Sequence, residues 1–172
     1  MTQLTDLEIT PAAPGDVPLL LDLIRELAEY EKLAPEAIAT AASLHASLFG
    51  PERSAEAVVA RVATVPAGFA LYFHNFSTFL GKRGLYLEDL FVRPEFRGRA
   101  IGKSLLIYLA KLAVARDCGR FEWAVLDWNR PARDFYEGLG ARANSAWVSY
   151  RLAGDALTTL AGEVPHRKPQ PN

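Results

Sequence analysis

The sequence contains a single cysteine, Cys118, among its 172 residues. One cysteine excludes an internal disulfide framework and any zinc or iron–sulfur site built from several cysteines. It also favours a reducing compartment, so we expect a cytoplasmic protein. Histidine is also scarce, and the three histidines are dispersed without the short spacing of a metal site. We therefore expect no metal.

Neither an excess of one charge nor a long apolar run is present. Nineteen Lys and Arg face 20 Asp and Glu, which leaves a formal net charge of -1 and no basic field over the whole molecule. Without such a field, binding to nucleic acid or to an anionic membrane surface is not expected. No segment approaches the roughly 20 apolar residues that cross a bilayer, and no secretory signal pattern opens the sequence.

The composition is that of an ordinary globular protein. Half of the residues are hydrophobic and 23% are charged, which is too apolar for a disordered chain. The length corresponds to one domain, and we expect it to span residues 1–160. Residues 161–172 contain three prolines and little to bury, so a disordered tail is expected there.

Strand-like and helix-like segments alternate along the chain. Strands are predicted from short β-branched and aromatic runs at residues 7–10, 57–65, 68–76, 85–93, 121–126 and 147–152. Helices are predicted at residues 17–28 (with Asp16 as N-cap), 35–48, 100–117 and 131–139. This order predicts an α/β fold with a mixed central β-sheet of six or seven strands and about four flanking helices.

The sharpest local feature is a basic turn between the strand ending near Arg93 and the helix starting near Ala100. Unpaired amides and the positive dipole end make a helix N-terminus a good anion site. Gly98 allows a close approach of the backbone, and Arg97, Arg99 and Lys103 add positive charge. The alternative is a tight turn whose basic side chains are simply solvated.

Two nucleotide-binding motifs do not fit this turn. A P-loop needs a glycine five positions before Gly102, but Arg97 stands there and Gly98 comes one residue too late. A dinucleotide fingerprint fails as well, because Ala100 occupies the place of its middle glycine.

The turn R-G-R-A-I-G, preceded by LYLEDLFVRPEF and followed by WNRPARDFYEGLGA, resembles the acetyl-CoA signature of the GNAT superfamily of N-acetyltransferases. The segments LAEYEKL, FSTFLGK and LYLED are similar to the diamine acetyltransferase branch. Within it, AVLDWN and Ser77-Thr78 are more similar to thialysine N-epsilon-acetyltransferases. The resemblance covers residues 7–152 and implies the GNAT fold, acetyl-CoA as acetyl donor and a homodimer.

The resemblance also implies a donor site. Its residues would be Phe91, Val92, Arg97, Gly98, Arg99, Ala100, Gly102, Lys103, Asn129 and Tyr136. Phe91 and Val92 would hold the pantetheine arm through main-chain hydrogen bonds, and the turn amides would bind the pyrophosphate. Ala100 departs from the glycine usual in the family, and we expect it to be tolerated if its φ is negative.

Two catalytic residues follow from the same resemblance. Tyr136 would be the general acid that protonates the CoA thiolate, because a phenol of pKa about 10 can supply that proton. The alternative is an aromatic core residue beside Phe135. Glu88 would pass the proton of the amine through water to solvent, since an amine with pKa about 10.4 must be neutral to attack a thioester.

The acceptor site is expected to be acidic. Glu88 and Asp89 lie inside an otherwise apolar strand, where carboxylates are costly to bury without partners. Strand alternation sends them to opposite faces unless a bulge intervenes. The alternative is a salt bridge to Arg83 or Arg93. By resemblance, the amine-binding residues are Tyr30, Glu31, Ser77, Thr78, Glu88, Asp89 and Trp147.

The sequence therefore predicts an enzyme that moves an acetyl group directly from acetyl-CoA to the primary amine of a small cationic molecule. A thialysine-like amino acid, a diamine or a polyamine would fit as acceptor. Two other functions stay open: a non-catalytic acyl-CoA-binding sensor, and an acetyltransferase that acts on protein or peptide amines.

Overall fold

The computed structural model describes residues 6–163. The chain divides into two compact units, residues 1–124 and residues 125–172. The single domain that we expect over residues 1–160 stays a prediction. The tail expected from residue 161 lies outside the described residues from residue 164 onward, and its first two residues belong to a helix.

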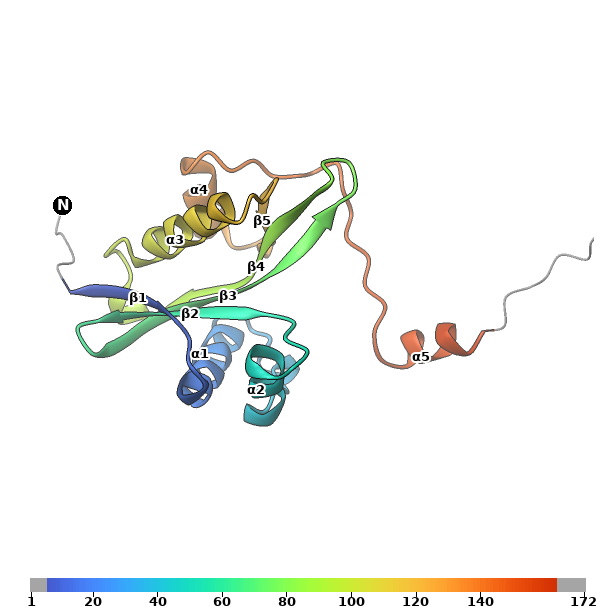
Figure 1. Cartoon of the computed structure of the whole chain (residues 1–172), viewed down its shortest axis with the longest axis horizontal. Helices are drawn as coiled ribbons and strands as arrows, with labels where there is room; N and C mark the ends of the chain where they lie inside the picture. Colours follow the sequence, from blue (N-terminus) through green and yellow to red (C-terminus); the bar gives the residue numbers. More distant parts are fainter. Residues whose placement is uncertain (1–5, 164–172) are drawn as a thin grey trace, which may run out of the picture. The chain divides into compact units, whose positions relative to one another are not determined.

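A mixed β-sheet forms the centre of the first unit (Figure 1). Its five strands lie in chain order: β1 (Leu7–Pro11), β2 (Glu56–Val62), β3 (Val65–Ser77), β4 (Lys82–Val92) and β5 (Phe121–Trp123). Neighbours from β1 to β4 are antiparallel, and β5 pairs with β4 in parallel. The α/β class with a mixed sheet is confirmed. The predicted six or seven strands are too many, because five form among the described residues.

Helices cover both faces of this sheet. α1 (Val17–Tyr30) and α2 (Ala41–Phe49) pack on one face, and α3 (Ile101–Ala115) lies on the other (Figure 1). Leu20 and Leu23 of α1 pack with Phe69 of β3, all three fully buried. The apolar face that predicts α1 from the sequence is thus the face that the sheet covers.

The ends of several elements differ from the sequence-based expectation. α2 begins at Ala41 because Thr40 caps it by accepting a hydrogen bond from the Ser43 amide at 3.1 Å. The β2–β3 turn lies at Ala63 and Thr64, where Ala63 takes a φ of 54°, so the later Pro66 falls inside β3. Much of the expected loop 77–84 is the tight end of the β3–β4 hairpin.

Asp16 precedes α1 but does not cap it through its side chain. Its carboxylate accepts a hydrogen bond from the Ala13 amide at 2.8 Å and pairs with Arg61 at 2.6 Å. Because a short 3-10 turn, Pro14–Asp16, leads straight into the helix, Asp16 has helical backbone angles and its side chain points back toward that turn.

The second unit contains two described helices, α4 (Arg130–Gly138) and α5 (Gly154–Gly162). The strand predicted at residues 147–152 does not form; these residues have no regular structure. A strand needs a partner for its hydrogen bonds, and the described part of this unit offers none. α5 was not predicted, because its short Gly- and Thr-containing segment has weak helix propensity.

Candidate active site

A bulge interrupts β4 at Glu88. Leu71 of β3 faces Asp89, whereas the next residue, Tyr72, faces Leu87, so Glu88 is the extra residue. A bulge bends a strand and re-aims the side chains around it. The acidic pair Glu88 and Asp89 therefore sits where the strict alternation of the strand is broken.

Beyond the bulge, one edge of β4 has no strand beside it. β5 pairs only with Leu85, Tyr86 and Leu87, and no other described strand lies on that side. The main chain from Glu88 to Val92 thus forms an open edge. We call this stretch the β4 edge.

The hydrogen-bonding register shows which main-chain groups point out of the β4 edge. The Arg93 amide donates to the Ala67 carbonyl at 2.9 Å. In an antiparallel ladder the preceding pair, Val92 and Gly68, therefore does not exchange hydrogen bonds, and the amide and carbonyl of Val92 point away from β3 into the open edge. By the same alternation the main-chain groups of Leu90 point into the open edge and those of Phe91 bond to β3. Sequence analysis missed Leu90, because only the register on β3 separates it from Phe91.

The turn after β4 presents a series of unpaired amides. Within the described residues, no backbone carbonyl accepts from the amides between Gly98 and Lys103; the Ser104 amide is the first to donate, to Ala100 at 2.9 Å. Gly98 has a φ of 74°, and nothing lies within 4 Å of where a Cβ would project. With the dipole of α3 behind them, these amides have the arrangement that an anion-binding site requires. Binding of an anion here stays a prediction.

Ala100 differs from the expectation. Its φ is 61° and its ψ is 11°, in the left-handed region, so the negative φ on which its tolerance was expected to depend is absent. A side chain other than glycine in that region costs about 1 to 2 kcal/mol. Ala100 therefore stores strain at the point where the chain passes from β4 into α3.

Replacing Ala100 with glycine is expected to relieve this strain. The gain in the free energy of unfolding is about 1 kcal/mol, because the greater freedom of glycine in the unfolded chain offsets part of the relief. For a chain of this size it corresponds to a rise in Tm of about 2 to 4 °C, measurable by calorimetry. Ala110→Gly in the middle of α3 is the control and lowers Tm. An unchanged or lower Tm for Ala100→Gly contradicts the assignment of strain.

Three carboxylates from two elements interact beside the β4 edge. Asp89 is largely buried, and that burial, with the negative charges of Glu88 and Glu31, raises its pKa to about 6. Burial also raises the pKa of Glu31, the residue that follows α1 as its C-cap. We call Glu31, Glu88 and Asp89 the acidic cluster. Repulsion among these three neighbouring carboxylates makes the cluster a favourable place for a cation.

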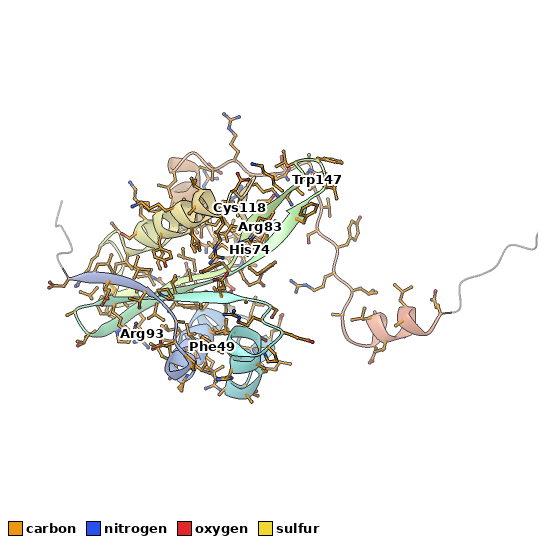
Figure 2. The ribbon with its side chains drawn as sticks, viewed as in Figure 1. Phe49, His74, Arg83, Arg93, Cys118 and Trp147 are labelled. Atoms are coloured by element: carbon orange, nitrogen blue, oxygen red, sulfur yellow. The ribbon has the colours of Figure 1, made fainter. Side chains whose placement is uncertain are left out.

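Arg93 does not neutralise this cluster. Its guanidinium binds both oxygens of the Glu26 carboxylate, at 2.7 to 3.2 Å, and donates to the Pro66 carbonyl. Figure 2 shows Arg93 on the side of the sheet that α1 covers. Arg93 therefore ties α1 to the end of β4, which fixes Tyr30 and Glu31 relative to the strand that carries Asp89.

Arg97 joins the turn to the end of α1. Its guanidinium lies 4.6 Å from the centre of the Tyr30 ring and 5.7 Å from that of Phe91. Its Nε donates to the Val92 carbonyl at 3.0 Å. The structure thus brings together residues predicted for the donor site and one predicted for the acceptor site.

Ser77 and Thr78 lie elsewhere in this unit. Ser77 ends β3, and its buried hydroxyl accepts a hydrogen bond from the Leu80 amide at 3.3 Å. Five residues separate it from Tyr72 opposite the bulge, which at about 3.3 Å per residue places it about 16 Å along the strand. Within one chain, the structure does not bring this pair to the acidic cluster.

Three predicted site residues belong to the second unit. The buried Asn129 caps α4 by accepting from the Ala132 amide at 3.3 Å. Tyr136 lies in α4 with its ring 5.4 Å from that of Phe135. Trp147, labelled in Figure 2, is 74% exposed in the segment between α4 and α5. Their roles stay predictions.

Residues 6–163 contain no group of three or more His, Cys, Asp or Glu side chains arranged to hold a metal ion. Among the helices of the same residues, none combines the length and the apolar character required to span a membrane.

Comparison with known proteins gives a consistent result. Residues 20–141 match the acetyltransferase (GNAT) family. Thialysine N-epsilon-acetyltransferase of Sus scrofa is 39% identical over 166 residues, covering 90% of this chain and 97% of that protein. L-ornithine N5-acetyltransferase of Arabidopsis thaliana is 32% identical, covering 87% of this chain and 85% of that protein.

A solved structure has the same fold over nearly the whole chain. An integron cassette protein from the mobile metagenome of V. cholerae superposes with a TM-score of 0.79 at 28% identity, covering 92% of this chain and 99% of that protein. The GNAT resemblance and the N-acetyltransferase class predicted from the sequence are confirmed. This chain belongs to the GNAT family of acetyltransferases.

Proposed function

We propose that this protein transfers an acetyl group from acetyl-CoA to the primary amine of a small cationic amino acid such as thialysine or ornithine. The observation that carries the proposal is the acidic cluster, whose partly buried Asp89 stands beside an open strand edge and a turn with unpaired amides. The names of the two relatives support the acceptor class. Diamines and polyamines carry the same cationic amine and belong to the candidates.

The first unit has a suitable surface for acetyl-CoA. The pantetheine arm of acetyl-CoA carries two amides and can pair with the β4 edge like an extra strand, through the outward main-chain groups of Leu90 and Val92. The pyrophosphate would then lie on the amides of residues 98–103, with Arg97, Arg99 and Lys103 nearby. This arrangement directs the thioester toward the bulge at Glu88.

The acidic cluster would bind and deprotonate the acceptor. Asp89 holds the ammonium group, and Glu88, exposed at the bulge, takes one proton from it through water and passes that proton to solvent. The neutral amine attacks the thioester carbonyl, which a main-chain amide near Val92 polarises. The new C–N bond forms in a tetrahedral intermediate, whose C–S bond then breaks. Tyr136 protonates the departing thiolate, and the second proton of the amine nitrogen restores the phenol through water.

This mechanism uses both units. Residues 88–103 belong to the first unit and Tyr136 and Asn129 to the second, so we propose that the two function as one acetyltransferase domain. The family match supports this, since residues 20–141 run across the division at residue 124. A cytoplasmic homodimer is proposed as well, on the scarcity of cysteine and on the family resemblance.

The test measures acetylation of a panel of amines through the release of the CoA thiol. The panel contains thialysine, lysine, ornithine, putrescine, spermidine, an aminoglycoside and a lysine peptide. We expect one small amine to give kcat/KM above about 10⁴ M⁻¹s⁻¹. Glu88→Gln should lower that value about 100-fold, while Glu8→Gln, which removes an exposed carboxylate on β1, changes little.

Two results would contradict the proposal and support one of the other two functions. Preference for the lysine peptide over every small amine indicates a protein acetyltransferase. Tight acetyl-CoA binding without turnover of any amine indicates the acyl-CoA sensor.

A further inference from the structure

Arg97 makes two contacts that the proposed substrates would also make. Its Nε donates to the outward carbonyl of Val92, where an amide of the pantetheine arm would donate. Its guanidinium lies on the ring of Tyr30, at 4.6 Å, where the cationic end of an amine would lie. One side chain therefore occupies a contact point of the donor and a contact point of the acceptor.

Both contacts depend on Arg97 folding back from the turn that carries it. Arg97 is exposed and directly precedes Gly98, the start of the unpaired amides. A pyrophosphate on these amides attracts the guanidinium, because an arginine binds phosphate more strongly than an aromatic face. An amide chain on the β4 edge at the same time takes the Val92 carbonyl. Donor binding thus removes both reasons for Arg97 to remain on Tyr30.

We propose that Arg97 is an internal competitor for the acceptor amine, held on Tyr30 in the free protein and released when acetyl-CoA binds. This inference rests on the proposed function, because it needs a CoA donor and a cationic acceptor. Its consequence is positive coupling: CoA strengthens amine binding and, by linkage, the amine strengthens CoA binding by the same factor. Each substrate then binds more tightly to the complex with the other substrate than to the free protein.

Calorimetric titration of thialysine into free and CoA-saturated protein measures the coupling. We expect CoA to raise the amine affinity about fivefold, the size of one exchanged cation–aromatic contact. In Arg97→Gln the free protein should already bind thialysine about fivefold more tightly, and CoA should add less than twofold. Equal coupling in the two proteins overturns the proposal.

Arg99→Gln is the matched control. Arg99 carries the same charge on the same turn, but its guanidinium lies over Phe96 at 5.6 Å and not over Tyr30. Both variants should weaken CoA binding, because each removes a cation near the pyrophosphate. Arg99→Gln should leave the thialysine affinity of the free protein unchanged; a rise equal to that in Arg97→Gln means that net charge explains the effect, and the proposal fails.

A second measurement observes Arg97 without any amine. Its ¹⁵Nε–¹Hε NMR signal, assigned by its loss in Arg97→Gln, should be shifted by the Tyr30 ring in the free protein and lose that shift on adding CoA. Tyr30→Leu should remove the shift without CoA. A signal that stays in place while calorimetry shows CoA bound overturns the proposal. If CoA does not bind at all, the proposed donor site is wrong, and the proposed release of Arg97 is wrong with it.

Discussion

Replacing Tyr136 with phenylalanine is expected to lower kcat about 100-fold and to leave the affinity for CoA within about twofold. The change removes one hydroxyl and keeps the ring that contacts Phe135, so α4 should fold unchanged. Without a phenolic proton the thiolate must leave unprotonated or take a proton from water, and a positioned general acid contributes about 10² to 10⁴ in rate. Steady-state kinetics and CoA titration measure the two quantities.

The matched control for this change is Tyr150→Phe. Tyr150 is 93% exposed in the same unit, so the loss of its hydroxyl should alter neither kcat nor CoA affinity. Equal, small effects of the two substitutions would exclude Tyr136 as the acid. A 100-fold weaker CoA affinity in Tyr136→Phe would instead assign the hydroxyl to donor binding.

The anion-binding turn is the part of the site that could be predicted from local sequence alone. A strand that ends at proline, a Gly-containing basic stretch and an apolar helix pattern fix where the unpaired amides between Gly98 and Lys103 lie. The conformation of Ala100 could not be read in the same way. Its left-handed φ is imposed by the path from β4 into α3, which belongs to the fold and not to the residue.

The acidic cluster needed tertiary information. The sequence allowed either strict alternation of Glu88 and Asp89 between the two faces of the strand or a bulge. The pairing of β4 with β3 shows that a bulge forms. The same pairing moved the outward main-chain groups to Leu90 and Val92. Glu31 joins from the end of α1, more than fifty residues earlier in the chain, so its electrostatic influence on Asp89 depends on how the helix packs on the sheet.

Strand predictions failed where a segment lacked a neighbour. Residues 57–62 pair with β1 and β3, residues 85–92 pair with β3, and both segments form strands as predicted. Residues 147–152 have a similar β-branched and aromatic pattern but no strand beside them among the described residues. The β-branched and aromatic pattern shows that a segment can fit into a sheet, but a strand forms only where a neighbouring strand pairs with it.

Asp89→Asn is expected to make the folded protein more stable at pH 8 and the enzyme much less active. Burial and two neighbouring carboxylates raise the pKa of Asp89 from 3.8 to about 6. Ionising it in the folded protein therefore costs about 2 to 3 kcal/mol more than in the unfolded chain. This cost is absent below pH 3.8 and complete above pH 6, so the asparagine variant should gain stability between these values and keep the gain at pH 8.

Urea unfolding of the two proteins from pH 4 to pH 8 gives the difference directly. Their free energies of unfolding should agree near pH 4 and differ by about 2 kcal/mol at pH 8. Glu29→Gln, on the exposed side of α1 near its end, should show no such divergence. A difference that does not change with pH contradicts the raised pKa of Asp89.

The same carboxylate should control the pH dependence of catalysis. In the wild type, kcat/KM for the amine falls as the pH drops through about 6, because protonated Asp89 no longer attracts the ammonium group. In Asp89→Asn we expect kcat/KM to be about 100-fold lower at pH 8, since the substrate cation loses its buried partner, and the fall near pH 6 to disappear. A bound amine cation lowers the pKa of Asp89, so the corresponding fall in kcat lies at lower pH than that in kcat/KM. A variant that is more stable, nearly inactive and free of this pH dependence identifies Asp89 as a charge that the fold buries at a cost because the acceptor needs it.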